Sequence, residues 1–262
     1  MDLQLAGKRA LVSGSTAGIG YAIAEALSRE GARVVVNGRT KARVDQAVGK
    51  LQAAFGEVHG LAADLGAAEG VREATRQFPD IEILINNLGI FEPKPFEQIT
   101  DEDWLRFFEV NIMSGVRLSR YYLPRMKQAN WGRIVFVSSE SALQIPAEMI
   151  HYGMTKTAQL AIARGLAETT AGTGVTVNSV LPGPTASEGV AQFVEGLAAA
   201  KHASAAQIER DFFEHTRPTS LLKRFETPEE IAAVVAFLAS PLSSAINGAA
   251  VRADGGVVRS IA

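Results

Sequence analysis

Short runs of β-branched and other apolar residues alternate along the chain with longer Ala- and Leu-rich segments. The runs cover residues 10–12, 34–36, 81–85, 134–137 and 175–181. Continuously apolar strands separated by helices are typical of a parallel sheet that is covered on both faces. We therefore predict an α/β fold, with a doubly wound parallel sheet in a three-layer α/β/α arrangement.

Two of the predicted helices carry clear start signals. Thr100 is followed three residues later by Asp103, and Thr227 is followed by Pro228 and Glu230. A hydroxyl followed by an acid at this spacing is typical of a capping box, and proline suits the first position of a helix. Helices are therefore expected to begin just after Thr100 and Thr227.

The length supports a single domain. With 262 residues, 47% hydrophobic and 21% charged, the chain can bury a large core without a second domain. No repeat, low-complexity tract or linker divides it, so residues 1–262 are expected to form one unit. The segment at about 187–218 is looser and Ala-rich, and we expect an inserted lid or pocket wall there.

Composition excludes several classes of function. The formal net charge is −2 and no basic run is present, so no nucleic-acid partner is expected. The chain has no cysteine, and its four histidines show no close ligand spacing, so we expect no metal site. No apolar run approaches the roughly 18 residues that a membrane span needs, and no leader is evident at the N-terminus. A cytoplasmic protein without a membrane partner is predicted.

Glycines cluster directly after the first predicted strand. Gly14, Gly18 and Gly20 lie between this strand and the next helical segment. Glycines at such a turn let the backbone approach a pyrophosphate and offer helix N-terminal amides to it. Their spacing is Gly-x-x-x-Gly-x-Gly instead of the commoner Gly-x-Gly-x-x-Gly, and the same glycines also suit a plain tight turn.

Polar residues follow three other predicted strands. Asp64 and Leu65 lie between the runs 34–36 and 81–85, where a further strand is expected, residues 86–89 (Asn-Asn-Leu-Gly) directly follow the run 81–85, and Tyr152 and Lys156 come after the run 134–137. The carboxyl ends of parallel strands share one edge of the sheet, where ligands of open α/β sheets bind. These residues are therefore expected to gather with the glycine turn around one ligand.

Tyr152 and Lys156 are four residues apart and share one face of a predicted helix. A core tyrosine with a lysine stem beside it is an equally ordinary arrangement. The chemical interpretation is that the ammonium lowers the pKa of the phenol, which is about 10 when unperturbed and too high for a base at neutral pH. A shift of roughly three units is about 4 kcal/mol, the interaction of two charges about 4 Å apart at an effective dielectric of about 20.

Taken together, these residues closely resemble the short-chain dehydrogenase/reductase family, in its branch of roughly 250 residues. The resemblance runs from Leu5 to about Arg259, and it implies a Rossmann-like fold. Two departures stand out: Ser13 replaces the threonine that precedes the glycine turn in the family, and Leu88 replaces the smaller alanine of Asn-Asn-Ala-Gly.

The resemblance implies a catalytic set and a cofactor site. The implied catalytic residues are Asn111, Ser139, Tyr152 and Lys156. In the family, the tyrosine is the acid or base, the lysine also bonds the nicotinamide ribose, the serine polarises the substrate oxygen, and the asparagine holds a water that relays protons to the lysine. The implied cofactor-binding residues are Gly14, Thr16, Gly18, Ile19, Gly20, Arg39, Asp64, Leu65, Asn87, Gly89, Tyr152, Lys156, Gly183, Thr185 and Ser187.

The end of the second strand predicts NADP(H) in preference to NAD(H). An NAD site places an acid there, which accepts hydrogen bonds from the ribose 2′-hydroxyl. Here the acid is missing: the strand ends Asn37-Gly-Arg39, and Arg39 can clamp a 2′-phosphate with help from Arg43. Against this, Ala17 occupies a place in the glycine turn where NADP-preferring relatives often carry a second basic residue, and Arg39 alone could stack on adenine.

The predicted function is an NAD(P)-dependent oxidoreductase that interconverts a secondary alcohol and a ketone by hydride transfer. Two alternatives stay open, a dinucleotide-binding sensor without turnover and an epimerase or dehydratase of the related longer branch. The substrate is a small molecule of open class: a sugar, a steroid-like compound, an acyl thioester or a cyclic ketone. Its pocket is expected between the catalytic serine and tyrosine, lined by Glu140, Gln144, Ile145, Glu148 and Met149.

Glu140 and Glu148 would disfavour anionic substrates if they point inward, and would have no influence as solvated surface acids. For the assembly, the C-terminal residues 249–259 suggest a final strand and glycine turn. The family counterpart of this segment lies at a subunit contact, so a homotetramer, or failing that a dimer, is expected.

Overall fold

The computed structural model describes residues 2–190, 196, 198 and 203–261. Within this part of the chain, a single parallel sheet of seven strands has the order β3-β2-β1-β4-β5-β6-β7. The strands are β1 (Arg9–Val12), β2 (Arg33–Gly38), β3 (Val58–Ala62), β4 (Ile83–Asn86), β5 (Gly132–Val137), β6 (Val175–Pro182) and β7 (Ala250–Ala253). The predicted α/β class and doubly wound parallel sheet are confirmed.

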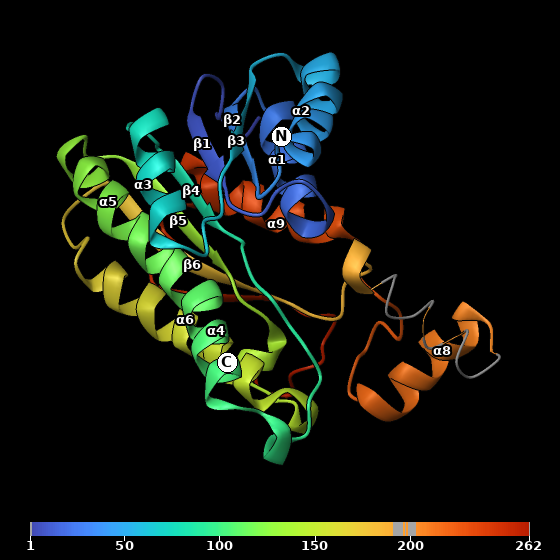
Figure 1. Cartoon of the computed structure of the whole chain (residues 1–262). Helices are drawn as coiled ribbons and strands as arrows, with labels where there is room; N and C mark the ends of the chain where they lie inside the picture. Colours follow the sequence, from blue (N-terminus) through green and yellow to red (C-terminus); the bar gives the residue numbers. More distant parts are fainter. Residues whose placement is uncertain (1, 191–195, 197, 199–202, 262) are drawn as a thin grey trace.

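Helices cover both faces of the sheet (Figure 1). One face is packed by α1 (Gly18–Arg29), α2 (Lys41–Phe55) and α9 (Pro228–Ala239). The other face is packed by α3 (Ala68–Gln77), α5 (Ser114–Gln128) and α6 (Ile150–Glu168). Alternate residues of β1 contact the two layers: Ala10 and Val12 belong to the first apolar core, and Leu11 to the second. The three-layer prediction is therefore confirmed.

Two capping boxes fix helix starts where the sequence predicts them. Thr100 and Asp103 cap α4 (Asp101–Phe107), and Thr227 and Glu230 cap α9, with both reciprocal hydrogen bonds present in each. After α4, residues Phe108–Met113 form a π-helical stretch, η2, that leads directly into α5. Such a stretch frees backbone carbonyls from the regular helical ladder, and one of them matters below.

The strand order reverses between β1 and β4, since β1 pairs with β2 on one side and with β4 on the other. Connections leave this point in opposite directions, so a crevice opens at the carboxyl ends of the strands. The expected lid region is described only in part. Residues 191–195, 197 and 199–202 of the predicted 187–218 segment lie outside the described residues.

The rest of that segment includes α8 (Ala205–Asp211) and a second π-helical stretch, η5 (Phe212–Thr216). Figure 1 shows α8 standing apart from the three layers. Among the described residues, no helix is both long enough and apolar enough to cross a lipid bilayer.

Candidate active site

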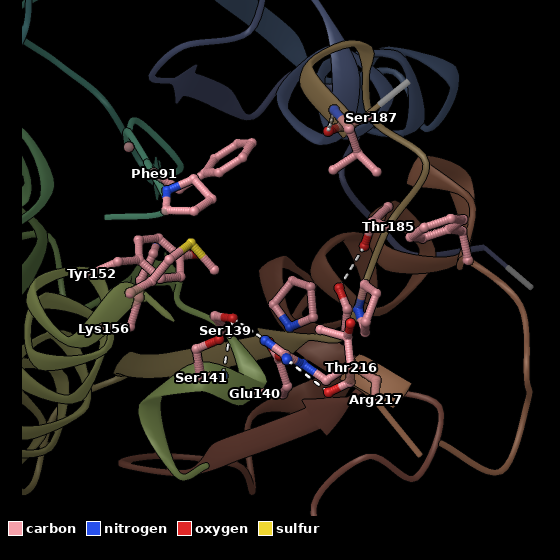
Figure 2. Close-up of a pocket in the computed structure, with 18 of the residues that line it drawn as sticks. Phe91, Ser139, Glu140, Ser141, Tyr152, Lys156, Thr185, Ser187, Thr216 and Arg217 are labelled. Carbon is pink, nitrogen blue, oxygen red and sulfur yellow. Dashed lines mark hydrogen bonds and ion pairs between the residues drawn. The ribbon is translucent and has the colours of Figure 1, made fainter. Parts of the chain in front are cut away.

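A cavity of about 810 Å³ opens at the carboxyl ends of β4, β5 and β6 (Figure 2). Many of the residues predicted from the sequence line it together, although they come from separate parts of the chain. These are Ile19, Asn87, Gly89, Ser139, Tyr152, Lys156, Gly183, Thr185 and Ser187. In the described part of the chain, no three His, Cys, Asp or Glu side chains are grouped to hold a metal ion.

The glycine turn, residues 14–20, has a backbone that only glycine fits well. Gly14 and Gly18 have φ angles of +62° and +57°, in the left-handed region that other residues rarely adopt. A Cβ on Gly20 would lie 2.3 Å from the carbonyl oxygen of Gly14 and 2.5 Å from Nδ2 of Asn87. The start of α1 therefore packs directly against the turn, which only glycine at position 20 allows.

Two buried amides hold this turn in place. Asn87 donates through Nδ2 to the carbonyls of Ser13 and Gly14, both at 3.0 Å. Asn37 accepts from the Gly14 N–H at 3.0 Å and donates to the carbonyl oxygens of Leu61 and Ala63. Sequence reasoning missed this role of Asn37, although an amide at the end of an apolar strand was a visible signal.

Lys156 is buried, with 4% of its surface exposed, and lies one helical turn after Tyr152 in α6. Its ammonium donates to the carbonyl of Val137 at 3.0 Å and to Oε1 of Gln159 at 3.4 Å. Burial lowers the pKa of Lys156 to about 8, against an opposing effect of Glu140. Near neutral pH the amine of Lys156 is therefore protonated, and its positive charge is lost as the pH rises past about 8.

The phenol of Tyr152 behaves differently from the expectation. Its pKa is raised, first by burial and then by the carboxylate of Glu140, and hydrogen bonding to Ser139 offsets this only in part. The ammonium of Lys156 lies 5.6 Å from the centre of the phenol ring and hydrogen-bonds other groups. The predicted lowering of the phenol pKa by Lys156 is therefore wrong for the protein alone, because burial has the larger effect.

Asn111 is buried within η2, and its side chain is fully committed to neighbouring groups. Its Oδ1 accepts from the N–H of Ile90 at 2.8 Å, and its Nδ2 donates to the Ile90 carbonyl and to Oγ1 of Thr155, both at 3.0 Å. The backbone carbonyl of Asn111, freed by the π-helical geometry, accepts from Nε2 of Gln159 at 2.6 Å.

Gln159 therefore joins the ammonium of Lys156 to the carbonyl of Asn111. Its side chain is 2% exposed and bonds both partners at once. Sequence reasoning missed this residue. Its signal was a polar side chain three residues after Lys156, on the same face of α6.

Two acidic side chains and one arginine line the cavity near Ser139. We call Glu140, Glu148 and Arg217 the substrate wall. Glu140 accepts a hydrogen bond from the hydroxyl of Ser139, and its other oxygen pairs with Nε of Arg217 at 3.0 Å. Nη1 of Arg217 lies 3.3 Å from Oε1 of Glu148. Figure 2 shows the guanidinium of Arg217, near the end of the 187–218 segment, reaching toward Ser139.

Of the predicted wall residues, Glu140, Glu148 and Met149 line the cavity, whereas Gln144 and Ile145 do not line it and are exposed. Arg217 was missed as an individual residue, although it falls within the predicted 187–218 segment. An arginine in a loop gives no local signal of its partner, because Glu140 is 77 residues away in the sequence.

Comparisons with known proteins agree with this geometry. A family model described as enoyl-(acyl carrier protein) reductase matches residues 14–258. The chain is 51% identical to the uncharacterized oxidoreductase YvaG of Bacillus subtilis, over 100% of both chains. The chain belongs to the short-chain dehydrogenase/reductase family. It is also 34% identical to the D-beta-hydroxybutyrate dehydrogenase of Cupriavidus necator, over 97% of this chain and 99% of the relative.

Among solved structures, the L-sorbose reductase of Gluconobacter frateurii, in complex with NADPH and L-sorbose, superposes with a TM-score of 0.94. Its sequence is 29% identical, and the match covers 100% of both chains. The protein is thus an oxidoreductase of the short-chain dehydrogenase/reductase family, which binds a nicotinamide dinucleotide.

The residues present fit such a cofactor. The first turn of α1 has no side-chain cap, and its Ile19 lines the cavity, so the N-terminal amides of this helix lie where a pyrophosphate can accept from them. Gly89 and Asn87, directly after β4, also line the cavity. Thr185 and Ser187, in the loop after β6, line the cavity opposite the catalytic residues.

Other predicted cofactor residues lie outside the cavity wall. Arg39 is exposed and has no hydrogen bond or ion pair within the described residues, while Arg43 pairs with Glu188 at 2.7 Å. Asp64 is also exposed, and it accepts from the N–H of Gly66. The side chain of Leu65 is buried in the core beneath α3 and α5.

Proposed function

We propose that this short-chain dehydrogenase/reductase interconverts a secondary alcohol and a ketone, with Tyr152 as the acid in the reducing direction. The proposal rests on one observation. Ser139, Tyr152 and Lys156 line a single cavity that begins beside the glycine turn. A protein that only binds the dinucleotide has no need of a phenol, a serine and a buried ammonium at one place.

The raised pKa of Tyr152 suits reduction. At neutral pH the phenol keeps its proton, so it can donate this proton to a carbonyl oxygen as negative charge develops there. When bound, the nicotinamide supplies or accepts the hydride. The ammonium of Lys156, held by Val137 and Gln159, stabilises the phenolate that the transfer leaves behind. Ser139 can donate a second hydrogen bond to the substrate oxygen once its single hydroxyl proton turns from Glu140 to the substrate.

The experiment is a turnover assay that follows NADPH absorbance with a panel of ketones, among them L-sorbose and acetoacetate, the latter a β-keto acid. Consumption of NADPH with formation of the alcohol supports the proposal. Tight binding of NADPH without turnover of any carbonyl favours the sensor alternative. A change of a sugar substrate without net NADPH consumption favours the epimerase or dehydratase alternative.

We further propose NADP(H) as the preferred cofactor. Arg39 is free to meet a 2′-phosphate, and Asn37, at the end of β2, carries no charge that would repel one. The L-sorbose reductase neighbour was solved with NADPH, which agrees with this preference. The test compares kcat/KM for NADPH and NADH in the wild type and in Arg39→Ala. Preference for NADH by about tenfold, a difference of about 1.4 kcal/mol, would overturn the proposal, as would an unchanged ratio in the variant.

We also propose that the chain assembles as a homotetramer, or failing that as a dimer. Leu221 is 82% exposed, close to the C-terminal glycine turn, where Gly255 accepts its N–H. An apolar side chain this exposed suits a subunit contact. A monomer in light scattering at micromolar concentration would refute the proposal. The cytoplasmic location stays a prediction.

A further inference from the structure

Arg217 and Glu140 form an ion pair inside the substrate cavity. Both are nearly inaccessible to solvent, with 7% and 5% of their surfaces exposed, and both line the cavity beside Ser139. Burying two charges is costly, and well-packed apolar residues often stabilise a fold as well or better. A pair kept at this place therefore points to a role in binding.

The hydrogen bonds leave donors unused on the guanidinium. Nε of Arg217 bonds Glu140, and Nη1 bonds Glu148 and the carbonyl of Thr216. Nη2 has no partner within the described residues, yet a guanidinium nitrogen of this kind carries two N–H donors. Each carboxylate oxygen of Glu140 has one partner and can accept a second hydrogen bond.

The charges of the substrate wall sum to a negative value. One guanidinium faces the two carboxylates of Glu140 and Glu148, which gives a formal charge of −1 when all three are ionised. The buried carboxylate of Glu140 opposes a carboxylate or phosphate on the substrate, and Glu148, whose side chain is 43% exposed, adds a weaker contribution because water screens it. A neutral hydroxyl meets no such opposition, because it can both accept from Arg217 and donate to Glu140.

The location of the Arg217–Glu140 pair determines which hydroxyl of the substrate it can bind. Ser139, which on the proposed function contacts the reacting oxygen, hydrogen-bonds Glu140 directly. A group on the carbon next to the carbonyl is therefore the part of the substrate that comes nearest to the pair. Elsewhere the lining of the cavity is largely apolar and includes Phe91, Met149 and Phe212.

Building on the proposed function, we propose that Arg217 and Glu140 bind the hydroxyl of an uncharged α-hydroxy ketone, and that the substrate wall rejects carboxylate substrates. In the reaction, the carbonyl carbon gains the hydride and its oxygen gains the proton of Tyr152. The product is a vicinal diol, and the bound hydroxyl is unchanged.

The test uses three substrates of similar size with NADPH: 3-hydroxy-2-butanone, 2-butanone and acetoacetate. We expect kcat/KM for the hydroxy ketone to exceed that for 2-butanone by about tenfold or more, the effect of one well-made hydrogen bond to a charged group. Acetoacetate should be the poorest substrate. Equal values for 3-hydroxy-2-butanone and 2-butanone, or a preference for acetoacetate, would overturn the proposal.

Variants separate recognition from structure. Arg217→Met should bring the ratio of hydroxy ketone to ketone close to one, and Glu140→Gln should lower it. Glu214→Gln is the matched control, because this acid is exposed and lies outside the cavity lining. If Arg217→Met does not fold, Glu148→Gln keeps the charge argument testable, since it should raise kcat/KM for acetoacetate several-fold. An unchanged preference in every folded wall variant overturns the assignment.

A binding measurement distinguishes this proposal from the proposed function. Failure of all three substrates to turn over would count against the function, not the subsite. Calorimetry with NADP⁺-loaded protein then compares 2,3-butanediol with 2-butanol. Tighter binding of the diol, lost in Arg217→Met, supports the subsite, and equal binding of the two alcohols rejects it.

Discussion

The glycine turn and the substrate wall both border one cavity and are held by different kinds of contact. Around the turn, neutral amides of Asn37 and Asn87 bond backbone groups. On the wall, Glu140 and Arg217 are buried charges that pair with each other. Both sets of contacts join segments that are distant in the sequence, but the first region is fixed by neutral hydrogen bonds and glycine backbone geometry, and the second by charge balance.

This difference indicates which properties each region controls. Neutral hydrogen bonds to backbone atoms do not titrate, so the shape of the turn should be independent of pH over the physiological range. Buried charges respond strongly to a single charge change, because the partner is left uncompensated. We therefore expect cofactor binding to follow from steric fit at the turn, whereas protonation and substrate choice follow from the electrostatics around the wall.

The largest effect should come from Tyr152→Phe, which separates chemistry from cofactor binding. Removing the hydroxyl takes away the proton donor, so kcat should fall by about a thousandfold, within the usual range for general acid catalysis. The Kd for NADPH, followed by fluorescence, should change by less than about twofold, because the glycine turn is untouched. Near-normal turnover would remove Tyr152 from the proposed role.

Next in size, Gly20→Ala tests whether the turn acts by steric fit. The new Cβ would lie 2.3 Å from the Gly14 carbonyl, so the turn must shift. We expect the Kd for NADPH to rise by about a hundredfold, roughly 3 kcal/mol.

Gly49→Ala is the matched control for this substitution. It lies in α2 with no atom within 4 Å of the added carbon, and it should stabilise the fold slightly. Wild-type NADPH affinity in Gly20→Ala would contradict the steric account of the turn.

A smaller effect is expected from the buried acid behind the loop that follows β6. Burial, with repulsion from Asp254 and Glu140, raises the pKa of Glu226 from 4.5 to about 7, although the N–H of Gly183 opposes this. The folded protein therefore holds this proton more tightly than the unfolded chain. The resulting stabilisation is complete below about pH 4.5 and is lost as the pH rises through about 7.

Glu226→Gln should remove this loss and stabilise the protein by about 2 kcal/mol at pH 8, with little gain at pH 4.5. Urea unfolding of both proteins at the two pH values measures the difference. The same difference at both pH values would show that the carboxyl does not titrate as proposed. It would also show that the buried acid Glu226 responds less to pH than we expect from the contrast between the substrate wall and the glycine turn.

The smallest effect concerns Gln159 as a positioning residue for Lys156. The active ammonium is lost above about pH 8, so kcat/KM should fall along an alkaline limb near that pH. Gln159→Leu removes an acceptor and should move this limb to lower pH by up to about one unit, whereas Gln159→Glu should move it to higher pH.

Gln128→Leu, at the exposed end of α5, is the control for the same change of side chain. Shifts of the two Gln159 variants in the same direction would indicate a packing role only. Opposite shifts would show that electrostatics, and not only shape, acts on the lysine side of the cavity as well as on the wall.

Much of the fold could be predicted because its signals are local. The apolar runs became β1, β2, β4, β5 and β6 with bounds shifted by a few residues, and the boxes at Thr100 and Thr227 cap α4 and α9 as predicted. Ser139, Tyr152 and Lys156 meet at one cavity, as the order of the strands implied. Arg217 could not be assigned from the sequence, because Glu140 is brought close to it only by packing, and the same holds for the contact of Gln159 with the Asn111 carbonyl.

The sequence by itself determined the parallel sheet, the glycine turn and the meeting of the catalytic residues. Strand periodicity and glycine sterics act between near neighbours, and the carboxyl ends of parallel strands share one edge. Only the tertiary structure decided the protonation of Tyr152 and the charge that faces a substrate. Both depend on how far water is excluded and on which charges lie within a few ångströms, and distant segments such as those of Glu140 and Arg217 set these conditions only after folding.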